Sequence, residues 1–253
     1  MQMRMPLHDA LPAGPGSPAV VSTATPSDAA STGVLPSSDG APATRRVWTT
    51  FSTDPIDLDC RNPDVLLAVL DVLLRYVAGG ASLVRLDAVG FLYERSGAAC
   101  LHLPETHALV KLLRACLDRV APDVLLITET NVPHTENISY FGDGDDDAQL
   151  VYNFSLAPLA LDAFEAGAAT VLPRWVDSLE LSSPRTTWFN FLASHDGVGV
   201  RPAEGLLAPE RIDRLVACVG ARGGQVGYRA TPDGGRRPYE LQSALFDSDD
   251  AAR

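Results

Sequence analysis

The chain has 253 residues, of which 46% are hydrophobic and 21% charged, and its formal net charge at pH 7 is -12. These values are typical of a globular chain that is long enough to bury a substantial core. The acidic balance argues against a nucleic-acid partner and against an anionic membrane surface, since both attract basic patches, but it is compatible with a neutral substrate such as a sugar.

Residues 1–46 are predicted to form a disordered, low-complexity tract. The tract is dominated by Ala, Pro, Ser, Thr and Gly, and it cannot bury enough apolar surface to offset its ordering entropy. It contains no continuous apolar region that would indicate a secretory signal, and no apolar run approaches the ~18 residues of a membrane span. Four widely spaced cysteines without a C-x-x-C pair indicate reduced thiols. We therefore expect a cytoplasmic protein whose catalytic domain comprises residues 47–253.

From residue 62 onward, amphipathic helices alternate with short apolar strands. Asn62 as N-cap and Pro63 at the first helical position begin a helix that ends at Gly79-Gly80. Strands are predicted at 82–86, 123–129, 148–154 and 186–194, and further helices at 105–120, 158–167, 173–181 and 209–219. This alternation indicates a parallel α/β architecture, either a doubly wound sheet or a (β/α)8 barrel. No G-x-G-x-x-G or P-loop sequence follows a strand, which disfavours a nucleotide-binding sheet.

Acidic residues stand at the ends of three of the predicted strands. The run SLVRLDAVGF (82–91) contains Arg85 and Asp87, which are read either as a structural ion pair or as a catalytic carboxylate held by its neighbour. Glu129 ends the next strand, and His195-Asp196 follow the last. Because active sites of parallel α/β folds lie at the carboxyl ends of the strands, the pattern favours the catalytic interpretation.

Three carboxylates on one edge are compatible with two chemistries. They could bind Mg²⁺ or Ca²⁺ through oxygen ligands, which would make the chain a metal-binding module. Alternatively, one carboxylate could attack an anomeric carbon while a second assists the leaving group. An arginine two residues before the first carboxylate favours glycosyl transfer, because a cation repels a metal ion. The acidic run DGDDDA (143–148) lacks the glycine and glutamate of an EF-hand and is predicted to be a solvated loop.

These segments resemble those of glycoside hydrolase family 13, the α-amylase family. VRLDAVGF is similar to its R-x-D segment, LLITETN to its acid/base segment and FNFLASHDG to its H-D segment. The sequence is closer still to the sucrose phosphorylase and glucosylglycerate phosphorylase branch, through ITETNVPHTENISYFGDGDDDAQLVYNFSL, SHDGVGVRPAEGLL and PDGGRRPYELQSALFD. The resemblance covers about 47–247 and implies a partial (β/α)8 TIM barrel. The matched segments correspond to about strands 4 to 7, and the chain ends in the insertion before the eighth.

The resemblance also implies roles for individual residues. Asp87 would be the nucleophile, Glu129 the acid/base, and Asp196 the residue that stabilises the transition state. The substrate-binding set would comprise Arg85, His195, His134 and Tyr239, with no metal ligand.

The implied activity is that of a retaining α-glucoside phosphorylase. Such an enzyme transfers glucose from sucrose or glucosylglycerate to inorganic phosphate through a covalent glucosyl-aspartate, without an organic cofactor. An α-glucoside hydrolase and a catalytically inactive fragment are the alternatives, because four strands cannot close a barrel. Self-association, or pairing with a chain that carries the missing strands, would complete it.

Overall fold

The computed structural model of the protein describes residues 30–36, 42–50, 56–231 and 235–242. By its internal contacts the chain divides into two compact units, Met1–Leu126 and Ile127–Arg253. The division falls inside strand β4 (Leu125–Thr128), whereas the sequence analysis placed a boundary after residue 46. Within the described ranges, no helix has the length and apolar composition needed to cross a membrane.

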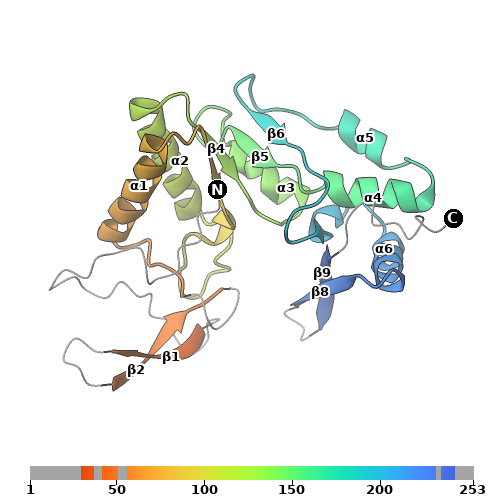
Figure 1. Cartoon of the computed structure of the whole chain (residues 1–253), viewed down its shortest axis with the longest axis horizontal. Coiled ribbons are helices and arrows are strands. Elements are labelled where there is room, and N and C mark those ends of the chain that lie inside the picture. Colours follow the sequence, from red (N-terminus) through yellow and green to blue (C-terminus); the bar gives the residue numbers. More distant parts are fainter. Residues whose placement is uncertain (1–29, 37–41, 51–55, 232–234, 243–253) are drawn as a thin grey trace. The chain divides into compact units, whose positions relative to one another are not determined.

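The first unit contains a two-stranded antiparallel sheet that the sequence analysis did not predict (Figure 1). Strand β1 (Ala30–Pro36) pairs with β2 (Pro42–Trp48) along their full length. The structure differs here from the predicted disordered tract, of which 1–29 and 37–41 lie outside the described residues. The physical reason is that hydrogen bonds between the two strands satisfy the backbone N–H and C=O groups of a hairpin. This pairing does not require alternating apolar side chains, and the sequence here has no such alternation.

Helix α1 (Pro63–Ala78) confirms the first predicted helix and both of its ends. The Asn62 side chain accepts a hydrogen bond from the backbone N–H of Asp64 at 2.9 Å, and Pro63 occupies the first helical position. At the other end the Gly79 N–H donates to the Arg75 carbonyl oxygen at 2.9 Å. Local capping thus determines the helix, which is why the sequence predicts it well.

Strand β3 (Leu83–Leu86) lies next to the start of β4. The Leu125 N–H donates to the Ser82 carbonyl oxygen at 3.0 Å. A short 3₁₀ helix η1 (Val89–Phe91) and helix α2 (Pro104–Val120) connect the two strands. The buried apolar side chains come from all of these elements: Val65, Leu73, Val84, Leu86, Val89, Val110, Leu113, Leu117, Val124 and Leu126.

A group of acidic side chains packs around Glu94, which is only 5% exposed. Burial raises the pKa of Glu94 to about 8, and the nearby carboxylates of Asp57 and Asp59 act in the same direction. Asp57 accepts a hydrogen bond from Thr50 Oγ1 at 2.5 Å, and Asp59 pairs with Arg61 at 2.7 Å. The two neighbouring carboxylates therefore have partners, whereas Glu94 keeps its proton to a much higher pH than a free glutamate.

The second unit continues a four-stranded sheet with the order β3-β4-β5-β6. Strand β5 (Leu150–Tyr152) pairs in parallel with β4 and with β6 (Thr187–Phe189), which confirms the predicted parallel α/β sheet. Both strands are shorter than the predicted 148–154 and 186–194. The ladder ends at the Tyr152–Phe189 pair, after which the side chains of Asn153 and Asn190 bond to each other at 2.8 Å.

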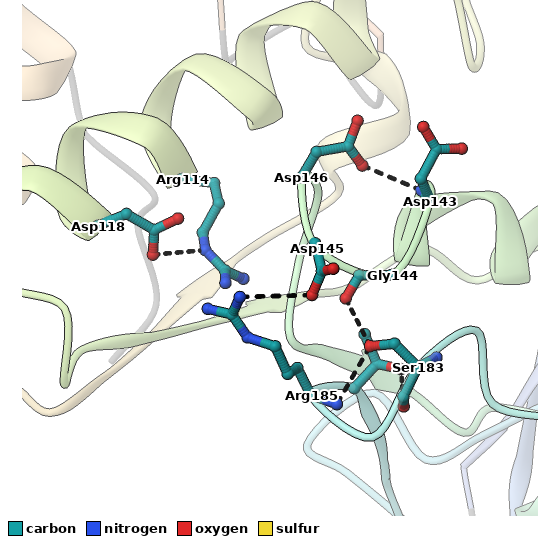
Figure 2. Close-up of polar contacts among 9 residues, drawn as sticks. Arg114, Asp118, Asp143, Gly144, Asp145, Asp146, Ser183 and Arg185 are labelled. Carbon is teal, nitrogen blue, oxygen red and sulfur yellow. Dashed lines mark hydrogen bonds and ion pairs between the residues drawn. The ribbon is translucent and has the colours of Figure 1, made fainter.

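The acidic loop 142–147 is tied to the segment that leads into β6 (Figure 2). The Ser183 hydroxyl donates to the Gly144 carbonyl oxygen at 2.7 Å, and Arg185 lies 3.5 Å from the Asp145 carboxylate. This loop follows the short helices α3 (His134–Asn137) and η2 (Ile138–Phe141). Among the residues that the structure describes, no group of three or more His, Cys, Asp or Glu side chains is arranged to hold a metal ion.

A third sheet, antiparallel and of order β7-β9-β8, packs with three helices in the second unit (Figure 1). Its strands are β7 (Val198–Gly199), β8 (Gln225–Ala230) and β9 (Arg236–Gln242). The helices are α4 (Leu156–Ala166), α5 (Leu172–Asp177) and α6 (Pro209–Ala221), close to three of the predicted helices. Their common core comprises Ala157, Leu159, Leu161, Trp175, Val198, Val200, Ala203, Leu207, Leu215, Val219 and Leu241.

The turn before β7 requires a glycine at position 197. Gly197 has φ +86, and a Cβ there would lie 2.2 Å from the carbonyl oxygen of Leu241 on β9. The turn is closed by reciprocal backbone hydrogen bonds between Ser194 and Gly197, each 3.0 Å. A residue without a side chain therefore allows β9 to approach this turn.

Gly197→Ala should destabilise the chain more than Gly205→Ala does. Gly205 has φ +82 but no atom within 4 Å of the place that an alanine methyl group would occupy, so both variants carry the left-handed strain of about 1–2 kcal/mol. Only Gly197→Ala adds a steric clash with backbone, which should cost a further ~1–3 kcal/mol. Urea unfolding of both variants measures the difference, and equal losses would contradict the close approach of β9.

Glu94→Gln should remove a pH dependence of stability. The Glu94 pKa rises from 4.5 to about 8 on folding, so ionisation favours the unfolded chain as the pH rises through this range. The melting temperature of the wild type should therefore fall relative to that of the variant between pH 4.5 and 8, and the difference should be constant above pH 8. Asp123→Asn, at an exposed carboxylate of the same unit, is the control and should follow the wild type. Parallel curves for wild type and Glu94→Gln would contradict the burial of a protonated carboxyl.

Candidate active site

Strand β3 positions the predicted nucleophile and its arginine. Asp87 immediately follows the strand, and its Oδ1 lies 2.5 Å from Nη1 of Arg85. The two side chains are only 8% and 12% exposed, so this is a nearly buried ion pair. Ala88, with φ +49, turns the chain directly after the carboxylate. The two interpretations of Arg85 and Asp87 are therefore compatible. The residues form an ion pair, and in it the guanidinium contacts one carboxylate oxygen of Asp87.

Strand β4 positions the predicted acid/base. Glu129 follows Thr128, the last residue of β4, and is 9% exposed. The next residues along the chain, Thr130 and Asn131, are also buried polar residues. A carboxyl group at the carboxyl end of a buried parallel strand lies where α/β folds place catalytic residues.

The His195-Asp196 pair lies in a turn and not at the end of a strand. Strand β6 ends at Phe189, and both residues belong to the Ser194–Gly197 turn that leads to β7. Nε2 of His195 lies 3.2 Å from Oδ2 of Asp196, and the Asp196 N–H donates to the Ser194 hydroxyl at 3.1 Å. About half of each side chain is exposed, so the pair faces solvent and is accessible to a ligand.

Strand β9 brings Tyr239 and Glu240 to this turn. Val198 pairs with Leu241 and Gly199 with Glu240, and the Val200 N–H donates to the Tyr239 carbonyl oxygen at 2.9 Å. At the end of the strand, Gln242 Nε2 donates to the carbonyl oxygen of Asp196 at 2.9 Å. Backbone and side-chain bonds therefore hold β9 along the whole 196–200 segment.

The Tyr239 hydroxyl lies among the charges of the candidate site. Burial raises its pKa to about 12, with further contributions from the carboxylates of Glu240, Glu129 and Asp196. Arg201 acts in the opposite direction. Within the second unit, the charges of the predicted residues Glu129 and Asp196 thus reach the predicted Tyr239. A phenol that keeps its proton can donate a hydrogen bond to a substrate oxygen throughout the neutral pH range.

Asn131 and Glu240 belong to the site but were missed by the sequence analysis. Asn131 Nδ2 donates to Glu240 Oε1 at 3.2 Å, which links the segment after β4 to β9. Burial, together with the charge of Asp196, raises the pKa of Glu240 above its ordinary value. Gly199 leaves room for this link, because a Cβ there would lie 2.7 Å from the Asn131 side chain. The only sequence signal was adjacency to the predicted Glu129 and Tyr239.

His134 lies against two tryptophan rings. Its imidazole stacks on Trp188 with ring centroids 5.3 Å apart, and meets the edge of Trp175 at 5.9 Å. Burial lowers the pKa of His134, which favours the neutral form of the ring. The structure thus gives His134 an aromatic environment, and its contact with a substrate stays a prediction.

The seven predicted site residues fall into two groups. Arg85 and Asp87 lie in the first unit, paired with each other, and the other five lie in the second unit. Within that unit the charges of Glu129 and Asp196 both act on Tyr239. Each group contains a nearly buried carboxyl group directly after a parallel strand, Asp87 after β3 and Glu129 after β4.

Comparison with known proteins identifies the family to which the chain is similar. The family model described as "Alpha amylase, catalytic domain" matches residues 46–201, more than half of the chain. Glucosylglycerate phosphorylase of Escherichia coli (strain K12) is 52% identical over 206 residues, which are 81% of this chain and 37% of that protein. Glucosylglycerate phosphorylase of Allomeiothermus silvanus is 56% identical over 202 residues, 80% of this chain and 36% of that protein.

A more distant relative and a solved structure also match the chain. Sucrose phosphorylase of Agrobacterium vitis is 35% identical over 185 residues, 68% of this chain and 34% of that protein. The crystal structure of sucrose 6F-phosphate phosphorylase from Thermoanaerobacter thermosaccharolyticum superposes with a TM-score of 0.72 at 21% identity, over 89% of this chain and 45% of that chain. This chain therefore spans less than half of each of these relatives, and its four-stranded parallel sheet is part of a (β/α)8 barrel. The chain belongs to the alpha-amylase family, glycoside hydrolase family 13, as a partial catalytic domain.

Proposed function

We propose that this chain acts in a retaining α-glucoside phosphorylase that transfers glucose from glucosylglycerate to inorganic phosphate. The observation that carries the proposal is the grouping of Glu129, Asp196 and Tyr239 in one unit, in a family whose members use paired carboxylates. Relatives of 52% and 56% identity named glucosylglycerate phosphorylase support this donor over sucrose, whose phosphorylase is 35% identical.

In the first half-reaction, a carboxylate oxygen of Asp87 attacks the anomeric carbon of the glucosyl group. The bond between that carbon and the glycerate oxygen breaks, and Glu129 transfers its proton to the departing oxygen. Asp196 hydrogen-bonds the sugar hydroxyls and stabilises the oxocarbenium-like transition state, with His195 as its partner at 3.2 Å. The product of this step is a β-glucosyl ester of Asp87 and free glycerate.

In the second half-reaction, a phosphate oxygen attacks the same anomeric carbon. The ester bond to Asp87 breaks, its carboxylate is regenerated, and Glu129 accepts the proton of the incoming phosphate. Two inversions at one carbon give α-glucose 1-phosphate with net retention. No organic cofactor takes part. The free thiols of Cys60, Cys100, Cys116 and Cys218 favour a reducing compartment, and we place the reaction in the cytoplasm.

Release of α-glucose 1-phosphate by the purified chain tests the proposal. We expect phosphate-dependent release from glucosylglycerate, with sucrose as the comparison donor. Asp87→Asn should abolish release, and Glu129→Gln should lower it by about 100- to 10,000-fold, because general acid–base catalysis supplies roughly that factor. Asp177→Asn, at an exposed carboxylate on α5, should leave release unchanged.

A donor with a good leaving group distinguishes the role of Asp87 from that of Glu129. The cleavage of α-glucosyl fluoride needs no proton from Glu129, so Glu129→Gln should form the glucosyl-enzyme from it, whereas Asp87→Asn should not. Glucose release that does not depend on phosphate would instead support the hydrolase alternative. A folded chain without turnover of any donor would support the inactive fragment.

A further inference from the structure

Arg201 lies beside the candidate site and has no assigned role. It begins the 3₁₀ helix η3 (Arg201–Ala203), and the preceding residue, Val200, bonds through its N–H to the Tyr239 carbonyl oxygen at 2.9 Å. Four charged groups among the described residues act on the Tyr239 hydroxyl. Three are the carboxylates of Glu129, Asp196 and Glu240, and the cation is Arg201.

The guanidinium of Arg201 is poorly satisfied by the protein. The nearest carboxylate oxygen, Oε2 of Glu136, lies 3.7 Å from its Nη2, beyond the usual range of an N–H···O hydrogen bond. Nε is buried and has no hydrogen-bond partner in the part of the chain that the structure describes, although the side chain as a whole is 19% exposed. Arg229 in the same unit also has a buried Nε without a partner among the described residues, but its Nη2 donates to Glu204 at 3.1 Å. Arg211 pairs with the buried Asp162. Arg201 thus differs in that no atom of its guanidinium approaches a carboxylate of the described residues to hydrogen-bond distance.

Burial of a guanidinium N–H without an acceptor is unfavourable, and a bound anion would provide the acceptor. The two nitrogens Nε and Nη2 form one edge of the planar group, which matches two oxygens of a phosphate or carboxylate. The phosphorolysis proposed above needs such a site, because phosphate attacks in one direction and glycerate in the other. Both are anions, and the carboxylates of Glu129, Asp196 and Glu240 would repel them.

We propose that Arg201 is the anion-binding residue of the acceptor subsite. Its guanidinium binds the phosphate or the glycerate carboxylate through two parallel hydrogen bonds and offsets the three neighbouring carboxylates. This inference rests on the proposed function for the identity of the anions. It makes Arg201 a determinant of acceptor specificity, since a neutral acceptor such as water gains nothing from it.

Direct binding of anions to the full chain tests the inference without any turnover. Isothermal titration with inorganic phosphate and, separately, with D-glycerate should show binding to the wild type. Arg201→Gln should weaken it by about 10- to 100-fold, the effect of removing charge-assisted hydrogen bonds. Arg201→Lys, which keeps the charge but loses the fork, should weaken it less. Arg229→Gln, a matched half-buried arginine, should bind both anions as the wild type does.

A second variant acts in the opposite direction. Glu136→Gln removes the carboxylate nearest to the guanidinium and should tighten phosphate binding several-fold. Circular dichroism of each variant confirms that it is folded. Phosphate binding that is equal in wild type and Arg201→Gln, or absent from the folded wild type, would overturn the inference. Loss confined to one of the two anions would support it and assign the subsite to that anion.

Measurements of enzyme turnover distinguish a failure of this inference from a failure of the proposed function. In a chain that is active, Arg201→Gln should raise the KM for phosphate by the same factor. An unchanged KM in an active enzyme would overturn the role of Arg201 while the proposed function stands. If the chain binds phosphate through Arg201 but transfers no glucose, the function fails and the anion site stands.

Discussion

The antiparallel pairing of β7 with β9 is the contact on which the candidate site of the second unit depends. It places Tyr239 and Glu240 along the segment that carries Asp196 and Arg201, although about forty residues separate them in the chain. The pairing is only two residues long, and β9 can approach because Gly197 carries no side chain, while Gly199 leaves room for the Asn131 side chain.

The site concentrates charge in a partly buried environment, and each carboxyl group is stabilised differently. Asp87 is paired with Arg85 at 2.5 Å, and Asp196 lies in an exposed turn beside His195. Glu240 accepts a hydrogen bond from Asn131 but still has a raised pKa because of burial. Carboxyl groups in such different surroundings are suited to the separate roles proposed above.

The helices could be predicted because their signals are local. Asn62, Pro63 and Gly79 act within one turn of the helix that they begin or end, and α1 has the predicted bounds. The parallel strands were predicted in the right places but too long, since their length depends on the partner: β5 and β6 pair over three residues only. The antiparallel sheet of β7, β8 and β9 was not predicted, because its pairing joins segments distant in the chain and its strands lack a strong apolar alternation.

The sequence by itself determined the parallel α/β class, the family, and the positions of Asp87 and Glu129 at the ends of two strands, because these follow from local periodicity and from motifs that are contiguous in the chain. Only the tertiary structure decided that Asp196 lies in a turn, that Asn131 bonds to Glu240, and that the buried Nε of Arg201 has no hydrogen-bond partner among the described residues. These features depend on which side chains face one another across β4, β7 and β9. Composition and spacing do not contain that information, because the approach of two strands is governed by packing and by the glycines that permit it.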